Sequence, residues 1–73
     1  MNQEKVEILA NKIIEELKRF NITLKYGYGD QVTLLSPSNP TITKDGWLII
    51  KDTDNKQERY INLESVYELI LHY

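Results

Sequence analysis

The chain has 73 residues, the size of one small domain, and it holds one histidine and no cysteine. Disulfide bonds and a thiolate zinc site are therefore excluded. The formal net charge of -2, from nine basic and eleven acidic residues, supplies no overall field for phosphate backbones or anionic lipid. A chain this short buries only about 60% of its unfolded surface, so we expect a single domain over residues 1–73 that gains buried area as a homodimer.

Apolar runs in the chain do not exceed four residues, at positions 47–50. A helix needs roughly 20 apolar residues to cross a bilayer, and no apolar stretch of a secretory leader is present. We therefore expect a soluble, cytoplasmic protein without membrane contacts.

Residues 4–20 have the three- and four-residue apolar spacing of an amphipathic α-helix. Asn2 is the expected N-cap, and Glu15 precedes Arg19 by four residues, which is the favourable order for an ion pair. The apolar stripe that we expect to face the core consists of Val6, Leu9, Ala10, Ile13, Leu17 and Phe20.

Residues 22–28 alternate between two faces, as is typical of a half-buried strand. Gly29 and Asp30 supply a turn, and residues 31–36 form the second strand of a hairpin. Residues 36–44 contain both prolines and no periodicity, so they are expected to form an extended surface loop. This loop either connects two parts of the sheet or carries a contact surface.

Residues 47–51 are the densest apolar stretch, and Asp45 and Gly46 precede them as a turn. Large apolar side chains point to both faces of this segment, so we expect an interior strand. The turn formers at 52–56 and the alternation at 57–62 predict that the chain returns as an antiparallel hairpin.

Asn62 is a good N-cap for a closing helix, because apolar residues follow it at three- and four-residue spacing. The predicted fold is α+β with the order α-β-β-β-β-α: one four-stranded antiparallel sheet with the two helices packed on one face. The other face of the sheet would be uncovered. The inner stripe of the closing helix would contain Leu63, Val66, Tyr67, Ile70 and Tyr73.

No segment has the residue pattern of a catalytic, cofactor or metal site. His72 has no partner in the sequence for metal binding or acid–base chemistry. Residues 52–58 resemble the start of a calcium loop, but Lys56 occupies a ligand position and Gln57 replaces the required glycine. Residues 27–29 lack the third glycine and the Lys-Ser/Thr pair of a phosphate loop. We therefore expect no enzyme activity and no cofactor.

The aromatic residues are the most informative feature for function. Five tyrosines, one tryptophan and one phenylalanine are more than a thin core encloses, and tyrosine and tryptophan are favoured where a surface binds a partner. The alternative is that they build the small core and cover its rim. The candidate interface consists of Tyr26, Tyr28, Trp47, Tyr60, Leu69 and Tyr73.

The leading interpretation is a small, non-enzymatic protein–protein interaction module. Compact acidic proteins of this kind are often regulators or inhibitors encoded by phages and other mobile elements. The alternative is a single-stranded nucleic-acid-binding protein, in which Lys25, Lys51 and Arg59 share the open sheet face with aromatic side chains that stack on bases. The negative net charge weighs against this alternative.

The run Arg59-Tyr60-Ile61-Asn62-Leu63-Glu64-Ser65-Val66 resembles the last part of Sm-like and other small β-barrels, where a basic-aromatic-apolar strand ends in a short polar turn. The expected first helix also fits that family, whereas the expected closing helix stands where the family has another strand. The resemblance covers eight residues, and neither an activity nor a site is carried over from it.

Overall fold

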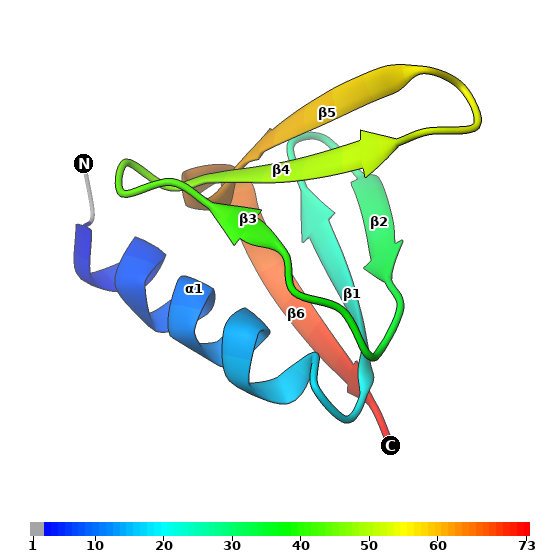
Figure 1. The fold of residues 1–73 in the computed structure, drawn as a ribbon. Helices are drawn as coiled ribbons and strands as arrows, with labels where there is room; N and C mark the ends of the chain where they lie inside the picture. Colours follow the sequence, from blue (N-terminus) through cyan, green and yellow to red (C-terminus); the bar gives the residue numbers. More distant parts are fainter. Residues whose placement is uncertain (1–2) are drawn as a thin grey trace.

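The computed structural model describes residues 3–73, so the predicted N-cap Asn2 lies outside the described residues. Within this range the chain forms one α-helix, six strands and one 3₁₀ turn (Figure 1). In chain order the elements are α1 (Gln3–Glu16), β1 (Asn21–Tyr26), β2 (Asp30–Leu34), β3 (Thr41–Ile42), β4 (Trp47–Asp52), β5 (Gln57–Asn62), the 3₁₀ turn η1 (Leu63–Ser65) and β6 (Val66–His72).

The six strands form two antiparallel three-stranded sheets (Figure 1). Sheet A has the strand order β2-β1-β6, and sheet B has the order β3-β4-β5. The predicted hairpins β1–β2 and β4–β5 are confirmed, and β4 is the interior strand of its sheet, as expected. The prediction of one four-stranded sheet with two helices on one face is wrong, because the two hairpins lie in different sheets.

The predicted closing helix is a strand. Asn62 does cap a helical turn, since its side-chain oxygen accepts a hydrogen bond from the Glu64 backbone N–H at 3.0 Å. That turn ends after three residues, and β6 then pairs with β1, which places Leu69 opposite Leu24. Pairing with β1 outweighs the helical spacing, because residues 66–73 are rich in the β-branched and aromatic side chains that favour strands.

The predicted loop at 36–44 contains a short strand. β3 pairs with β4, where Thr41 lies opposite Ile49 and Ile42 opposite Leu48. The residues before β3 carry the chain from β2 in sheet A to sheet B (Figure 1). The segment is therefore the connection between the two sheets.

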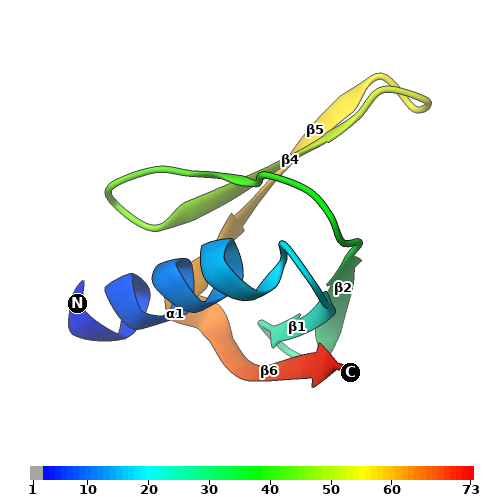
Figure 2. The ribbon, with the colours of Figure 1, turned by 60° about the horizontal axis from the view of Figure 1, so that its bottom comes forward.

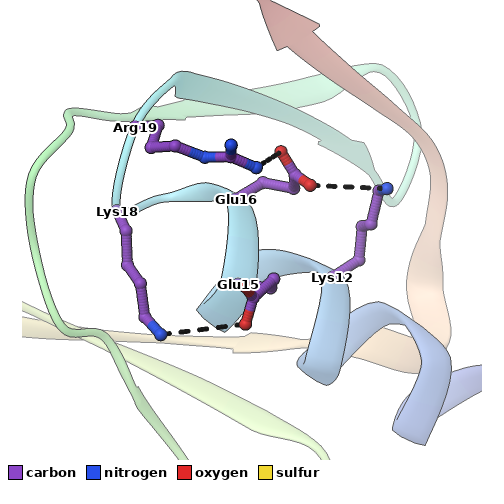
Figure 3. A network of polar contacts seen from close by, with 5 residues as sticks. All are labelled: Lys12, Glu15, Glu16, Lys18 and Arg19. Atoms are coloured by element: carbon purple, nitrogen blue, oxygen red, sulfur yellow. Dashed lines mark ion pairs between the residues drawn. The ribbon is translucent and has the colours of Figure 1, made fainter.

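Helix α1 ends at Glu16, whereas the sequence predicted a helix up to Phe20. Ion pairs surround its last turn (Figure 3): the Glu16 carboxylate lies 3.7 Å from Lys12 Nζ and 3.5 Å from Arg19 Nη2. Arg19 thus pairs with Glu16 and not with the expected Glu15. After residue 16 the chain leaves the helical path. It forms a tighter turn, in which a backbone hydrogen bond joins residues 16 and 19.

The core lies between the two sheets, and α1 lies across the side that the sheets leave open (Figures 1 and 2). The predicted inner stripe of the first helix is confirmed at Val6 and Ile13, which are buried; Leu17 is buried too, although it follows the end of α1. The buried apolar residues are Val6, Ile13, Leu17, Ile22, Leu24, Leu34, Leu48, Ile61, Leu63 and Val66.

The hairpin of β4 and β5 extends beyond the core. In both views its tip points away from α1 and sheet A (Figures 1 and 2). Residues 53–60 are all exposed, in contrast to Leu48 and Ile61 at the base of the hairpin. We call residues 51–58 the hairpin arm.

Candidate functional site

The candidate functional site is the face of sheet B that points away from the core. Leu48 and Ile61 form a register pair and are both buried. Because side chains alternate along a strand, the residues next to this pair point to the opposite side. The outer face of sheet B therefore consists of Thr41, Trp47, Ile49, Lys51, Glu58, Tyr60 and Asn62.

Strand register brings the large side chains of this face together. Ile49 lies between Thr41 on β3 and Tyr60 on β5. Trp47 precedes Ile49 by two residues and is a diagonal neighbour of Tyr60, a separation that is typically about 7–8 Å. Trp47 is 37% exposed and Tyr60 is 57% exposed, so Trp47, Ile49 and Tyr60 form an aromatic and apolar surface on this face.

The turn before β4 positions Trp47. The Thr43 N–H donates to the Trp47 carbonyl at 2.9 Å, and the Trp47 N–H donates to Thr43 Oγ1 at 3.0 Å. Thr43 Oγ1 donates in turn to the Asp45 carboxylate at 2.6 Å. Gly46 completes the turn with a φ of 91°, a conformation that glycine adopts readily. The predicted Asp45-Gly46 turn is confirmed.

A groove of about 370 Å³ borders the outer face, between β4 and the loop that precedes β3. Leu35 and Pro40 line it, and Leu35 is 67% exposed. Ile49 lines the groove as well, so the groove and the outer face of sheet B are continuous. Sequence reasoning missed Leu35, although it stands on the solvent side of the alternation that placed Val32 and Leu34 in the core.

The six predicted interface residues do not form one surface. Trp47 and Tyr60 share the outer face of sheet B. Tyr26 is half-buried, and its hydroxyl accepts a hydrogen bond from Arg59 Nη2 at 2.8 Å, which links sheet A to sheet B. Tyr28 lies in the turn after β1 and is fully exposed.

The other two predicted residues lie on the C-terminal strand and directly after it. Leu69 is half-buried on β6 and packs against the core. Tyr73 follows β6 and is 94% exposed, and its ring meets that of Phe20 edge to face with 5.1 Å between the centroids. Tyr67, which the sequence placed on an inner helix stripe, is exposed. β6 therefore carries a second aromatic and apolar segment, apart from the outer face of sheet B.

The basic residues that nucleic-acid binding would require on one face lie apart. Lys51 is on the outer face of sheet B, directly opposite Glu58. Arg59 points to the other side of that sheet, where it binds a tyrosine of β1. Lys25 lies in sheet A, 3.4 Å from the Glu68 carboxylate. These three basic residues therefore do not share the open face that the nucleic-acid alternative requires.

His72 has a partner that the sequence did not reveal. Its Nε2 lies 2.7 Å from Thr23 Oγ1, which lies 2.9 Å from Thr33 Oγ1. These side chains come from the three neighbouring strands of sheet A, and Thr23 is only 6% exposed. No carboxylate hydrogen bonds to His72 within residues 3–73, so the group lacks the orienting acid of a nucleophile–base triad. We interpret it as a structural link across sheet A.

The segment that resembles a calcium loop forms the turn of the hairpin arm. The Asp52 carboxylate accepts hydrogen bonds from the Asn55 side-chain amide at 2.7 Å and from the Asn55 backbone N–H at 3.2 Å. These bonds stabilise the charged carboxylate and lower the pKa of Asp52 below its ordinary value. In the described part of the chain, no three His, Asp or Glu side chains are grouped so as to hold a metal ion.

No protein-family model matches the chain, and no solved structure matches it. No helix within residues 3–73 is both long and apolar enough to cross a membrane. The eight residues that resemble Sm-like barrels span the end of β5, η1 and the start of β6, and β6 stands where a closing helix was expected. The chain thus has a strand where that family has one. However, neither the family models nor the solved structures support membership in the family.

Proposed function

We propose that this protein is a small, non-enzymatic interaction module of the cytoplasm that binds another protein through the outer face of sheet B. The observation that carries the proposal is the surface of Trp47, Ile49 and Tyr60, which strand register gathers on a sheet face directed away from the core. Tyrosine and tryptophan supply large contact areas at low entropic cost, and they dominate the binding energy of many protein interfaces.

The charges around this surface favour a protein partner over nucleic acid. Lys51 and Glu58 lie opposite each other on the same face and balance in charge. A single-stranded nucleic-acid site combines stacking aromatic residues with a basic groove that follows the phosphates. Only the aromatic half of that combination is found on the outer face of sheet B.

The wider role that we propose is that of a regulator or inhibitor encoded by a phage or another mobile element, acting as a homodimer. The small size and the acidic composition support the assignment to this class of regulators. The thin core supports the homodimer.

Site-specific photo-crosslinking in the native host tests the binding face. The photoreactive residue p-benzoylphenylalanine replaces Tyr60 in one variant and the fully exposed Tyr28 in a matched control. We expect a defined protein adduct from position 60 and none from position 28. Equal adducts from both positions, or adducts with nucleic acid alone, would contradict the proposal.

The binding energy of the face is tested by alanine substitution once the cross-linked partner is known. Tyr60→Ala is expected to weaken binding at least tenfold, about 1.4 kcal/mol, because Tyr60 is the more exposed of the two aromatic residues. Tyr28→Ala should leave the affinity unchanged. A titration with labelled single-stranded oligonucleotide at low salt covers the alternative: quenching of Trp47 with a steep salt dependence would favour nucleic acid.

A further inference from the structure

The outer edge of β6 is a long strand edge without a neighbour. β6 is the last strand of sheet A, and in the described chain no other strand pairs with it beyond β1. In Figure 2 it forms the lower margin of the molecule, and α1 lies above it. It spans seven residues, Val66–His72, with Glu68 as its one acidic residue and neither lysine nor proline to block pairing. Proteins usually protect such an edge, so an occupant is to be expected.

The backbone pattern shows which groups of β6 point outward. The Gly27 N–H donates to the Ser65 carbonyl at 3.2 Å, so the adjoining register pair of Tyr26 and Val66 is of the type without mutual hydrogen bonds. The register with β6 shifts between Lys25 and Tyr26, but β1 pairs with β2 without a shift, so alternation along β1 directs the groups of residues 21, 23 and 25 toward β6. Their partners Glu68, Ile70 and His72 point toward β1. The N–H and C=O groups of Leu69 and Leu71 therefore point to the free edge.

We propose that β6 pairs antiparallel with β6 of a second copy of this chain, across a twofold axis at Ile70. Leu69 of each copy then lies opposite Leu71 of the other, and each pair exchanges two backbone hydrogen bonds. At the axis, Ile70 of one copy lies opposite Ile70 of the other copy. The two three-stranded sheets join into one continuous sheet of six strands, β2-β1-β6-β6-β1-β2.

The side chains of β6 fit this register. The twofold axis at Ile70 places Glu68, which lies 3.4 Å from Lys25 of its own copy, opposite His72, so that an acid meets an imidazole. His72 Nε2 is bonded to Thr23, which leaves Nδ1 for the carboxylate. An axis at Glu68 would bring two carboxylates together, and an axis at Leu69 would place Glu68 opposite Ile70. Charge complementarity therefore selects the axis at Ile70.

This inference rests on the homodimer proposed above and gives it an interface, and it is independent of the protein partner. The outer face of sheet B contains no residue of β6, so a dimer formed in this way keeps both copies of that face open. Such a dimer would present two identical binding surfaces to a partner.

Light-scattering chromatography across a dilution series tests the interface with two complementary variants. Wild type should elute at twice 8.6 kDa, whereas Ile70→Lys and Ile70→Glu should each elute at 8.6 kDa, because like charges meet at the axis. An equimolar mixture of the two variants should return to the dimer mass, since Lys and Glu then face each other. A dimer of Ile70→Lys alone would overturn the interface and leave the homodimer standing; a monomeric wild type would overturn both.

A cysteine variant gives a second test that does not depend on the charged variants folding. The chain has no cysteine, so Ile70→Cys carries one thiol per copy. Facing residues in a pair without mutual hydrogen bonds have Cα atoms about 4.5 Å apart, which a disulfide can span. Mild oxidation should give a covalent dimer from Ile70→Cys and none from the control Thr53→Cys in the hairpin arm. Equal cross-linking of the two variants would refute the pairing.

Discussion

Gly46 shows how much of this small fold depends on one residue. A Cβ atom at this position would lie 2.8 Å from Cγ1 of Val6 in α1, and the φ of 91° is strained for any other residue. The Gly46 carbonyl also accepts a hydrogen bond from the Leu63 N–H at 2.9 Å. Helix α1, the turn before Trp47 and η1 therefore meet at a single glycine.

Gly46→Ala is expected to destabilise the protein by about 2–3 kcal/mol, as the sum of backbone strain and the clash with Val6. Gly29→Ala is the matched control, because Gly29 has a φ of 99° but open space around its Cβ position. Its cost should be confined to about 1 kcal/mol of strain. Urea unfolding followed by tryptophan fluorescence measures both values, and equal losses would show that Val6 moves aside at no cost.

At the scale of the elements, local patterns in the sequence were reliable where one signal dominates. The apolar spacing that includes Val6 and Ile13 identified α1, and turn residues next to alternating segments identified two hairpins. Asn62 was correctly identified as an N-cap, but a cap starts a helix without setting its length. From Val66 onward, helical spacing and β-branched or aromatic content predict different structures. Pairing with β1 decides between helix and strand, and no local signal in the sequence predicts that pairing.

Thr23 holds the three strands of sheet A together through Thr33 and His72. Thr23→Val keeps the shape of the side chain and removes both hydrogen bonds, so we expect a loss of about 1–2 kcal/mol in the free energy of unfolding. Thr33→Val should cost less than 0.5 kcal/mol, roughly the level of an ordinary surface substitution, because Thr33 is exposed and water replaces its bond. Thermal or urea unfolding compares the two variants; a Thr23→Val variant as stable as wild type would mean that the network contributes nothing.

At the scale of the molecule, the distribution of the aromatic residues was not readable from the sequence. Placing Trp47 and Tyr60 on one face requires the register of β4 and β5, and the sequence does place both on neighbouring strands. Tyr26 and Tyr73 also stood on periodic segments, yet one bridges the sheets and the other packs on Phe20. The split into two sheets could not be predicted, because the length of the loop before β3 permits several arrangements.

The hairpin arm should be the least protected part of the described chain. Its residues 53–58 have solvent on both sides, whereas β1 is covered by β2, β6 and the core. Local opening of such a segment needs little of the global unfolding energy. Amide hydrogen exchange measured by NMR should be on the order of 100-fold faster in the arm than in β1. Equal protection in both would indicate that another molecule or a second copy covers the arm.

The pairing of β1 with β6 also bears on how the chain is made. Leu69, the partner of Leu24, is made 45 residues later, which at about 5–20 residues per second takes about 2–9 s of translation. Throughout that interval the edge of β1 that pairs with β6 has no partner strand. A premature stop codon before Val66 would leave this edge open for the lifetime of the fragment.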